Sequence, residues 1–293
     1  MLTQDVSLIG FGEAGQAFAG ARGWRGIARA YDRLTDRPEP RSAKQAEYLR
    51  ATVRGCGSTR EAVFEAGLVL SLVTANQALA AAGEVAEYLR PGALFCDMNS
   101  VAPGTKQAAA AMIEAAGGRY VDVAIMSPVT PARLDVPLLL SGPAAEDAHG
   151  ALGALGFSNI RRVGPRVGQA SAIKMIRSVV VKGIEALTAE AMLAAELTGV
   201  TEEVLASLDA SEKSCSWFER ADYNLDRMIV HGARRAEEMG EAVKMLEQLG
   251  VEPAMTRATV RCQDRIGALR LGRPAPNLAG KIEQIATERA RAA

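Results

Sequence analysis

The first half of the chain alternates short, continuous apolar runs with longer stretches in which apolar residues recur at helical spacing. Continuous apolar runs are typical of parallel strands that are buried on both faces. The runs that predict strands lie at 6–9, 26–31, 68–73, 93–98, 120–125, 137–141 and 160–163. Because helical stretches separate them, we predict an α/β fold with a doubly wound parallel sheet.

The pattern changes after Gly164-Pro165-Arg166-Val167-Gly168, and no convincing strand follows. Apolar residues keep helical spacing over 169–197, longer than an average globular helix. Further helices are expected near 201–209, 211–221, 224–250 and 254–270, with a last helical stretch beyond Pro274 and Pro276. We therefore predict two domains, an α/β domain at 1–163 and an all-helical domain at 164–293, joined by the long helix.

The segment between the second strand and the next helix carries two prolines and several charges, at 33–40. Proline cannot continue a strand or the interior of a helix, so this segment is predicted to be a loop. Helical patterning follows over 42–66 and is broken at Gly55-Cys56-Gly57. Ser58 is a candidate N-cap for the short helix after that break.

The first predicted strand runs directly into Gly10-Phe11-Gly12-Glu13-Ala14-Gly15, and a helical stretch follows. In a dinucleotide-binding turn, Gly10 permits the tight bend, Gly12 admits a pyrophosphate, and Gly15 allows close packing of the helix on the strand. The N-terminus of the helix then faces the phosphates. A GxGxxG pattern alone is a weak signal, but Asp32 at the end of the second strand occupies the place where ribose hydroxyls are read. The first domain is thus predicted to bind a dinucleotide.

Composition excludes several other classes. The chain has 293 residues, 48% of them hydrophobic, with 34 basic and 34 acidic side chains, so neither nucleic acid nor an anionic membrane is expected as a partner. Four cysteines lie far apart and there are only two histidines, so we predict no metal site and no disulfide framework. No secretory signal and no apolar run long enough to span a membrane is readable. A cytoplasmic protein is expected.

Four motifs together resemble the β-hydroxyacid dehydrogenase family, which includes 3-hydroxyisobutyrate and 6-phosphogluconate dehydrogenases. They are the opening glycine turn, Leu72-Val73-Thr74, the run Asp97-Met98-Asn99-Ser100-Val101-Ala102-Pro103, and Gly168-Gln169-Ala170-Ser171-Ala172-Ile173-Lys174. The resemblance implies hydride transfer between NAD or NADP and a small hydroxy acid or its semialdehyde. It also implies cofactor contacts from Val73 and Thr74, substrate and nicotinamide contacts from Asn99 and Ser100, and Lys174 as the acid/base. The helical domain resembles a less-characterised, 6-phosphogluconate-dehydrogenase-like branch.

The chain departs from the family pattern where the substrate carboxylate is usually bound. The family's DxPVSGG stretch reads Asp122-Val123-Ala124-Ile125-Met126-Ser127-Pro128 here, without either glycine. Ala170 stands at the usual second glycine of GxGxxxK, and Ser178 stands where the family commonly has asparagine. Ser178 lies one helical turn after Lys174, so it keeps the same helix face and a hydrogen-bonding role.

Lys174 fits the chemistry that hydride transfer requires, because a carbon that bears oxygen needs a proton donor or acceptor at that oxygen. Ile173, Met175 and Ile176 surround it in the sequence. We expect these apolar neighbours, and the cationic ring of an oxidised cofactor, to lower the lysine pKa toward working pH. The alternative is a surface lysine whose stem lies along apolar residues.

Two signals for the cofactor conflict. Asp32 would accept hydrogen bonds from the free ribose hydroxyls of NAD and repel a 2′-phosphate, whereas Arg33, Arg37 and Arg41 could pair with that phosphate. The position of the acidic residue at the strand end favours NAD.

Basic residues in the second half of the chain suggest a small anionic substrate. They are Arg177 and Lys182 on the long helix and His231, Arg234 and Arg235 on a later one. For Arg234 and Arg235 a solvated helix face, with Glu237 and Glu238 as partners, is an equal alternative.

Three other functions stay open at this point. A non-catalytic dinucleotide-binding sensor or regulatory subunit would keep the glycine turn but would not need Lys174 or the Asn99-Ser100 turn. An imine reductase shares the architecture, although such enzymes often replace this lysine. A sugar-acid oxidative decarboxylase usually has a histidine and an asparagine where Arg177 and Ser178 stand. The long helix and the apolar helical domain suggest a homodimer.

Overall fold

The computed structural model describes residues 4–212 and 214–291, which fall into two compact units, Met1–Val179 and Val180–Ala293. The division lies inside the long helix α7 (Gln169–Thr198), whereas the sequence placed the domain boundary at 163 and 164. The first turns of α7 belong to the first unit because buried side chains of its sheet hold them. Gly168 and Ser171, for example, donate backbone N–H groups to Asp122.

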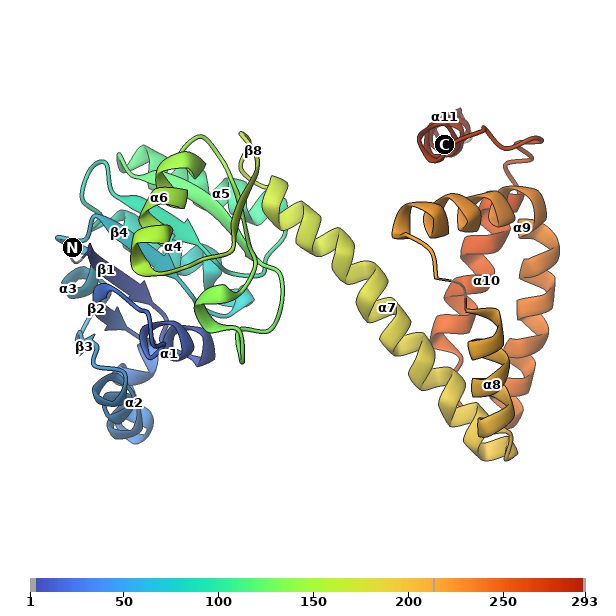
Figure 1. Ribbon diagram of the computed structural model, residues 1–293, viewed down its shortest axis with the longest axis horizontal. Coiled ribbons are helices and arrows are strands. Elements are labelled where there is room, and N and C mark those ends of the chain that lie inside the picture. Colours follow the sequence, from blue (N-terminus) through green and yellow to red (C-terminus); the bar gives the residue numbers. More distant parts are fainter. Residues whose placement is uncertain (1–3, 213, 292–293) are drawn as a thin grey trace. The chain divides into compact units, whose positions relative to one another are not determined.

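The first unit is built on an eight-stranded sheet of order β3-β2-β1-β4-β5-β6-β7-β8, which confirms the predicted α/β architecture (Figure 1). Two strands depart from the parallel arrangement, since β7 pairs antiparallel with β6 and β8 pairs parallel with β7. The connection between β6 and β7, residues 126–137, contains the short 3-10 helix η3 (Arg133–Asp135) but no α-helix, which a parallel crossover usually contains. The strands are β1 (Gln4–Ile9), β2 (Gly26–Tyr31), β3 (Arg54–Gly55), β4 (Leu68–Ser71), β5 (Leu94–Asp97), β6 (Arg119–Ile125), β7 (Leu138–Ser141) and β8 (Ile160–Gly164).

Two apolar cores, one on each face of the sheet, fix the layers of this unit. On one face, Phe18 and Leu152 pack with Leu8 of the sheet. Val85 and Ile113 belong to the core on the other face. Helices α1 (Glu13–Ala19) and α6 (Ala145–Leu155) contribute to the first core, and α3 (Thr59–Val63), α4 (Ala78–Ala86) and α5 (Pro103–Ala115) contribute to the second. The glycine turn and the polar residues of the candidate site lie at the carboxyl ends of the parallel strands, between these two layers of helices.

The proline-containing segment predicted as a loop is mostly helical. The 3-10 helix η1 covers Arg33–Asp36, and α2 (Pro38–Arg50) begins at Pro38. Proline is tolerated in the first turn of a helix, because backbone N–H groups in that turn have no partner within the helix and the fixed φ of proline is already helical. The break predicted near Gly55 contains the two-residue strand β3, and α3 begins after Ser58, whose hydroxyl accepts from the Glu61 N–H.

The second unit is helical, with α8 (Thr201–Ser211), α9 (Trp217–Gln248), α10 (Ala254–Gly267) and α11 (Leu278–Arg291) following α7 (Figure 1). The two helices predicted at 211–221 and 224–250 were wrong, because one 32-residue helix, α9, runs without a break from the end of the first prediction through most of the second. The signal for its start is a capping box, in which Ser216 and Glu219 each accept a hydrogen bond from the other's backbone N–H. Residue 213, inside the first predicted helix, lies outside the described residues.

Close helix packing and buried charges hold this second unit together. A Cβ added to Gly267 of α10 would lie 2.3 Å from the Ala233 backbone nitrogen of α9, so glycine is required at this crossing. Lys281 of α11 pairs with Asp222 at 2.9 Å and Asp226 at 3.2 Å on α9. Glu190 of α7 accepts three hydrogen bonds at the start of α10.

Candidate functional site

The glycine turn lies between β1 and α1, and each of its glycines has a different steric role. Gly10 has a φ of 86°, and a Cβ there would lie 2.7 Å from the Leu72 carbonyl oxygen. A Cβ on Gly15 would come within 3.1 Å of the Phe11 ring, so this glycine admits a buried aromatic side chain beneath the turn. Gly12 is different, because a Cβ added to it would meet nothing within 4 Å. Its backbone is therefore open to an approaching group.

Asp32 joins the end of β2 to the glycine turn. Its Oδ2 accepts from the Phe11 N–H at 2.8 Å, and its Oδ1 accepts from the Leu34 N–H at 3.0 Å. Lys44 of α2 lies 3.8 Å from Oδ2 and donates to the Phe11 carbonyl at 2.8 Å. Asp32 and Lys44 thus brace the turn in addition to any contact with a ligand.

A cavity of about 360 Å³ opens beside this turn. Its volume lies in the range of small-molecule sites. Thr59 on its wall is buried, and the Thr59 hydroxyl has no hydrogen-bond partner among the described residues. The open backbone at Gly12 and this unpaired hydroxyl fit the adenosine half of a dinucleotide. Six of the residues predicted to bind the cofactor line the cavity, namely Gly10, Gly12, Asp32, Arg33, Val73 and Thr74.

The remaining predicted cofactor residues form the body of the turn. Phe11 is fully buried, and its ring packs against Tyr48 with centroids 5.0 Å apart. Ala14 is partly buried against the same core, Glu13 is exposed in the first turn of α1, and Gly15 lies under the turn. Glu13 and Ala14 stand in the first turn of α1, where backbone N–H groups have no partner within the helix.

A second polar group lies at the carboxyl end of β5. The Asn99 N–H donates to Asp97 Oδ1 at 2.9 Å, and Asn99 Nδ2 donates to Ser71 Oγ at 2.9 Å. Asn99 is 5% exposed, and its Oδ1 is buried without a hydrogen-bond partner in the described part of the chain. A buried carbonyl that lacks a donor is costly, so Asn99 presents an acceptor that suits a ligand N–H or O–H.

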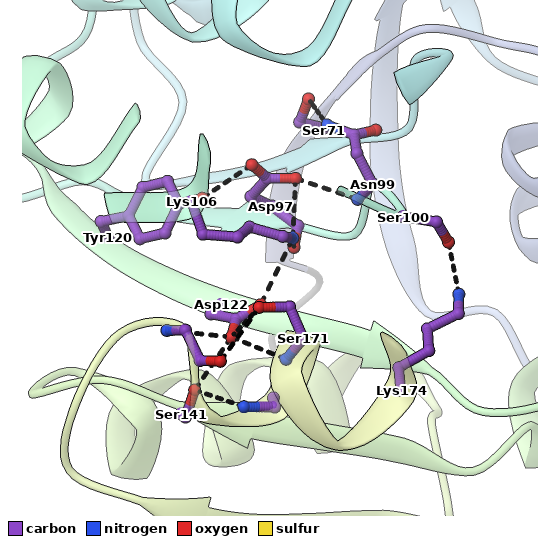
Figure 2. Close-up of polar contacts among 12 residues, drawn as sticks. Ser71, Asp97, Asn99, Ser100, Lys106, Tyr120, Asp122, Ser141, Ser171 and Lys174 are labelled. Carbon is purple, nitrogen blue, oxygen red and sulfur yellow. Dashed lines mark hydrogen bonds and ion pairs between the residues drawn. The ribbon is translucent and has the colours of Figure 1, made fainter. Parts of the chain in front are cut away.

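Lys174 of α7 reaches the residue that follows Asn99. Its Nζ donates to Ser100 Oγ at 2.5 Å (Figure 2). The structure therefore brings together three of the four residues predicted to be catalytic, from the β5 turn and from the first two turns of α7. Ser178, the fourth, lies one turn further along α7 and is partly buried.

A buried charge cluster lies beside these residues (Figure 2). Lys106 Nζ lies 3.0 Å from Asp97 Oδ1 and 3.4 Å from Asp122 Oδ1, and it donates to the Asp97 carbonyl at 2.6 Å. The Tyr120 hydroxyl donates to Asp97 Oδ2 at 2.7 Å. Burial, together with the Asp97 carboxylate, raises the pKa of Tyr120 above its usual value, so this hydroxyl stays a donor. Lys106 has no exposed surface.

The cations predicted to bind substrate are spread over both units. Arg177, in the first unit, and Lys182, in the second, are exposed on α7. His231 and Arg235 are partly buried on α9, while Arg234 is exposed and pairs with Glu238 at 3.0 Å, as the solvated alternative expected. The apolar neighbours of Lys174 are more exposed than predicted, since Ile173 is 39% and Ile176 is 68% accessible.

Sequence reasoning did not identify Lys106, Asp97, Asp122 or Lys44 as functional candidates. A signal for Lys106 was present, because it lies three, four and seven positions before Ala109, Ala110 and Ile113, which share the buried face of α5. A lysine on an apolar helix face needs a buried partner. The partners come from β5 and β6, and only the sheet order places them together.

Within 4–212 and 214–291, no helix is both long enough and apolar enough to cross a membrane. No group of three or more histidine, cysteine, aspartate or glutamate side chains in the same ranges is placed to hold a metal ion. The four cysteines are unpaired, and burial raises the pKa of Cys96 to about 12.

Comparisons with protein families agree with this geometry. A family described as the NAD binding domain of 6-phosphogluconate dehydrogenase matches residues 5–151, which include the glycine turn, the cavity and the Asn99 turn. A second family, described as a domain of unknown function (DUF1932), matches residues 195–266 in the helical unit.

Solved structures extend the similarity over the whole chain. A conserved hypothetical protein from Sinorhizobium meliloti 1021 is 36% identical, with a TM-score of 0.62, and the match covers 98% of this chain and 97% of that one. A conserved protein of unknown function, described as structurally similar to 3-hydroxyacid dehydrogenases, is 32% identical, with a TM-score of 0.59, over 91% of this chain and 98% of that one. An imine reductase from Myxococcus stipitatus in complex with NADP⁺ shares the fold at 19% identity and a TM-score of 0.69, over 90% of this chain and 94% of that one.

The glycine turn with its adjoining cavity, the eight-stranded sheet and the two family matches are consistent with one another. The chain belongs to the β-hydroxyacid dehydrogenase family, with an NAD(P)-binding domain of the 6-phosphogluconate dehydrogenase type followed by a DUF1932 domain.

Proposed function

We propose that this protein is an NAD(P)-dependent oxidoreductase that acts on a small hydroxy acid or its semialdehyde, with Lys174 as the acid/base. The observation that carries the proposal is the hydrogen bond from Lys174 Nζ to Ser100 Oγ at 2.5 Å. Ser100 follows Asn99, whose buried Oδ1 has no hydrogen-bond donor among the described residues. An amine, a hydroxyl and an unpaired acceptor thus lie in the unit that carries the dinucleotide cavity.

Each of these groups has a distinct part in the chemistry. The nicotinamide, when bound, supplies or accepts the hydride. Lys174 donates a proton to the substrate oxygen when a carbonyl is reduced and accepts it when an alcohol is oxidised. Ser100 orients the amine through the hydrogen bond, and Asn99 accepts from an N–H or O–H of the bound ligands. Ser178 lies on the helix face of Lys174 and serves as a further contact for the substrate.

A small carboxylate is the proposed substrate class. Arg177 lies three residues after Lys174 on α7, and a guanidinium binds a carboxylate in bidentate geometry. The stretch Asp122–Pro128 lacks both glycines of the family's DxPVSGG pattern, so Arg177 would supply the contact with the substrate carboxylate.

For the cofactor we propose a preference for NAD over NADP. Asp32 lines the cavity, and its carboxylate would repel a 2′-phosphate and accept from ribose hydroxyls. The imine reductase from Myxococcus stipitatus was solved with NADP⁺, and Arg33 is the residue through which this chain would accept that cofactor.

A second copy of the chain is the proposed partner. Apolar residues recur along α7 at Ile173, Ile176, Val180, Ile184 and Leu187, at intervals of three or four residues that place them on one helix face. All five are at least 39% exposed in the single chain. Contact with the same face of a second copy would cover them and desolvate the surroundings of Lys174.

Turnover by purified protein tests the proposed function. The protein is mixed with NAD or NADP and a panel of small hydroxy acids, and absorbance of the reduced nicotinamide is followed. Lys174→Ala is expected to lower kcat by roughly 10² to 10⁴ while the dinucleotide still binds. Lys244→Ala is the control, because Lys244 is exposed on α9 and pairs with Glu241. If Lys174→Ala turns over as fast as the unmodified protein, Lys174 is not the acid/base, and dinucleotide binding without turnover of any substrate favours a sensor.

A further inference from the structure

We propose that Lys106 is a positioning residue, which sets the separation of Ser100 and Lys174 by joining Asp97 to Asp122. The role of the Ser100–Lys174 pair in catalysis rests on the function proposed above. The physical coupling between the two segments rests on contacts within the first unit alone (Figure 2).

On one side, Asp97 holds the turn that carries Ser100. Its Oδ1 accepts from the Asn99 N–H at 2.9 Å, and its Oδ2 accepts from the Tyr120 hydroxyl at 2.7 Å. Asp97 is 1% exposed. The position of this carboxylate therefore determines where the backbone leaves β5 and enters the Asn99-Ser100 turn.

On the other side, Asp122 holds the start of α7. Its Oδ2 accepts from the N–H groups of Gly168 at 3.1 Å and Ser171 at 2.9 Å, and from the Ser171 hydroxyl at 3.1 Å. Ser141 Oγ adds a donor to Asp122 at 3.0 Å and accepts from the Ala170 N–H at 3.0 Å. Lys174 lies one turn after these anchored amides, so Asp122 fixes the helix from which its side chain projects.

Lys106 connects the two carboxylates. Its ammonium group donates to the Asp97 carbonyl at 2.6 Å and forms ion pairs with Asp97 Oδ1 at 3.0 Å and Asp122 Oδ1 at 3.4 Å. All three side chains are buried, so any displacement of one carboxylate leaves a charge without compensation in a low-dielectric interior. The Ser100 turn and the first turn of α7 are thereby held in one arrangement relative to each other.

A core residue that only fills space would not account for these contacts. A methionine or leucine on α5 would pack against Ala109, Ala110 and Ile113 without a charge, but it would leave Asp97 and Asp122 facing each other. The carboxylates cannot be dispensed with, because together they accept from backbone amides at the two segments that carry Ser100 and Lys174. The lysine places a positive charge between the two carboxylates.

Amide hydrogen exchange of Lys106→Met tests the coupling without any substrate. We expect peptides covering 97–102 and 166–174 to exchange at least tenfold faster, together, while the peptide covering 10–19 is unchanged. Lys281→Met is the matched control, because Lys281 is also buried between two aspartates but joins α9 to α11 in the second unit. It should leave both peptides of the first unit protected.

Kinetics of the same variants test the consequence for catalysis. Lys106→Met should lower kcat at least tenfold at a temperature where it remains folded, with the dissociation constant of the reduced dinucleotide changed less than threefold. Lys281→Met should keep kcat within threefold of the unmodified protein. A purely structural lysine would lower the melting temperature in both variants without this selective loss of kcat.

Ser141→Ala provides a milder variant should Lys106→Met fail to fold, because it deletes only the hydroxyl between Asp122 and Ala170. Faster exchange at 166–174 and a reduced kcat, with the dinucleotide still bound, support the proposal. Unchanged protection of both peptides, or equal kcat losses in Lys106→Met and Lys281→Met, would overturn it. Because exchange requires no turnover, a wrong assignment of the substrate class would be seen as inactivity of the unmodified protein and would leave the coupling result intact.

Discussion

At the scale of single residues, the two ends of the Asn99 side chain differ, because the amide nitrogen makes a structural hydrogen bond and the carbonyl oxygen makes none among the described residues. Its Nδ2 donates to Ser71, while its buried Oδ1 has no partner in the described part of the chain. Asn99→Ala removes both groups, whereas Ser71→Ala removes the shared hydrogen bond and keeps the Asn99 carbonyl. The two variants therefore separate the roles of the two ends of one side chain.

We expect Asn99→Ala to raise the substrate KM or the cofactor dissociation constant about tenfold, which corresponds to one hydrogen bond to a ligand. Ser71→Ala should change the same constants less than threefold. Steady-state kinetics and titration with the reduced dinucleotide measure both. Equal effects of the two substitutions would show that the Asn99 carbonyl binds no ligand.

Arg33 bears on the choice of cofactor. It lines the cavity and donates to Gln77 at 2.6 Å, so its guanidinium lies beside the adenosine site. Arg33→Ala should raise the KM for NADP about tenfold, because a charge-assisted contact with the 2′-phosphate is lost, and leave the KM for NAD within threefold. Arg60→Ala, an exposed arginine of α3, is the control. Unmodified protein should have the higher kcat/KM with NAD, and the opposite order would contradict the role given to Asp32.

At the scale of elements, Glu190 joins α7 to the start of α10. Burial by itself raises the pKa of Glu190, but hydrogen bonds from the Thr256 hydroxyl and the N–H groups of Met255 and Thr256 outweigh it and lower the pKa. Its folded pKa therefore lies below the unfolded value, so the contribution to stability is complete above the ordinary carboxyl pKa of about 4.3. It is lost as the pH falls through the lower, folded value.

Glu190→Gln should destabilise the second unit at neutral pH by about 1 to 3 kcal/mol, since hydrogen bonds to a charged acceptor are replaced. The difference between the variant and the unmodified protein should shrink as the pH is lowered below about 4. Urea unfolding followed by circular dichroism at a series of pH values measures it. A difference that does not depend on pH would show that the carboxylate charge is not what stabilises the start of α10.

At the scale of the whole molecule, the exposed apolar face of α7 bears on assembly. Val179 is 74% exposed next to that face, and Leu49 of α2 is 79% exposed without comparable neighbours along its helix. The two residues are therefore matched in exposure but differ in context.

Val179→Glu should weaken association and shift the molar mass toward that of one chain, because a charge would be buried at the contact between copies. Leu49→Glu should leave the molar mass unchanged. Size-exclusion chromatography with light scattering measures both. A single-chain mass for the unmodified protein at micromolar concentration would exclude the proposed dimer.

The sequence determined the local features of this protein, because strands, turns and helices follow from neighbouring residues. Apolar runs located every strand except the two-residue β3, which has no apolar run, and the spacing of Gly10, Gly12 and Gly15 located the turn beside the cavity. Reasoning from neighbouring residues was wrong at the ends of helices. Proline was expected to prevent a helix, but Pro38 begins α2. It also missed the capping box at Ser216 and so divided α9 in two.

The tertiary structure alone decided which distant residues meet. Asp97, Lys106 and Asp122 are separated by helices and turns in the sequence, and the order of β5 and β6 in the sheet brings them within ion-pair distance. The same order places Ser100 against Lys174, 74 positions away. Sequence spacing has no information about such pairs, because the free energy that selects them comes from packing the whole sheet and from compensating charges in its interior.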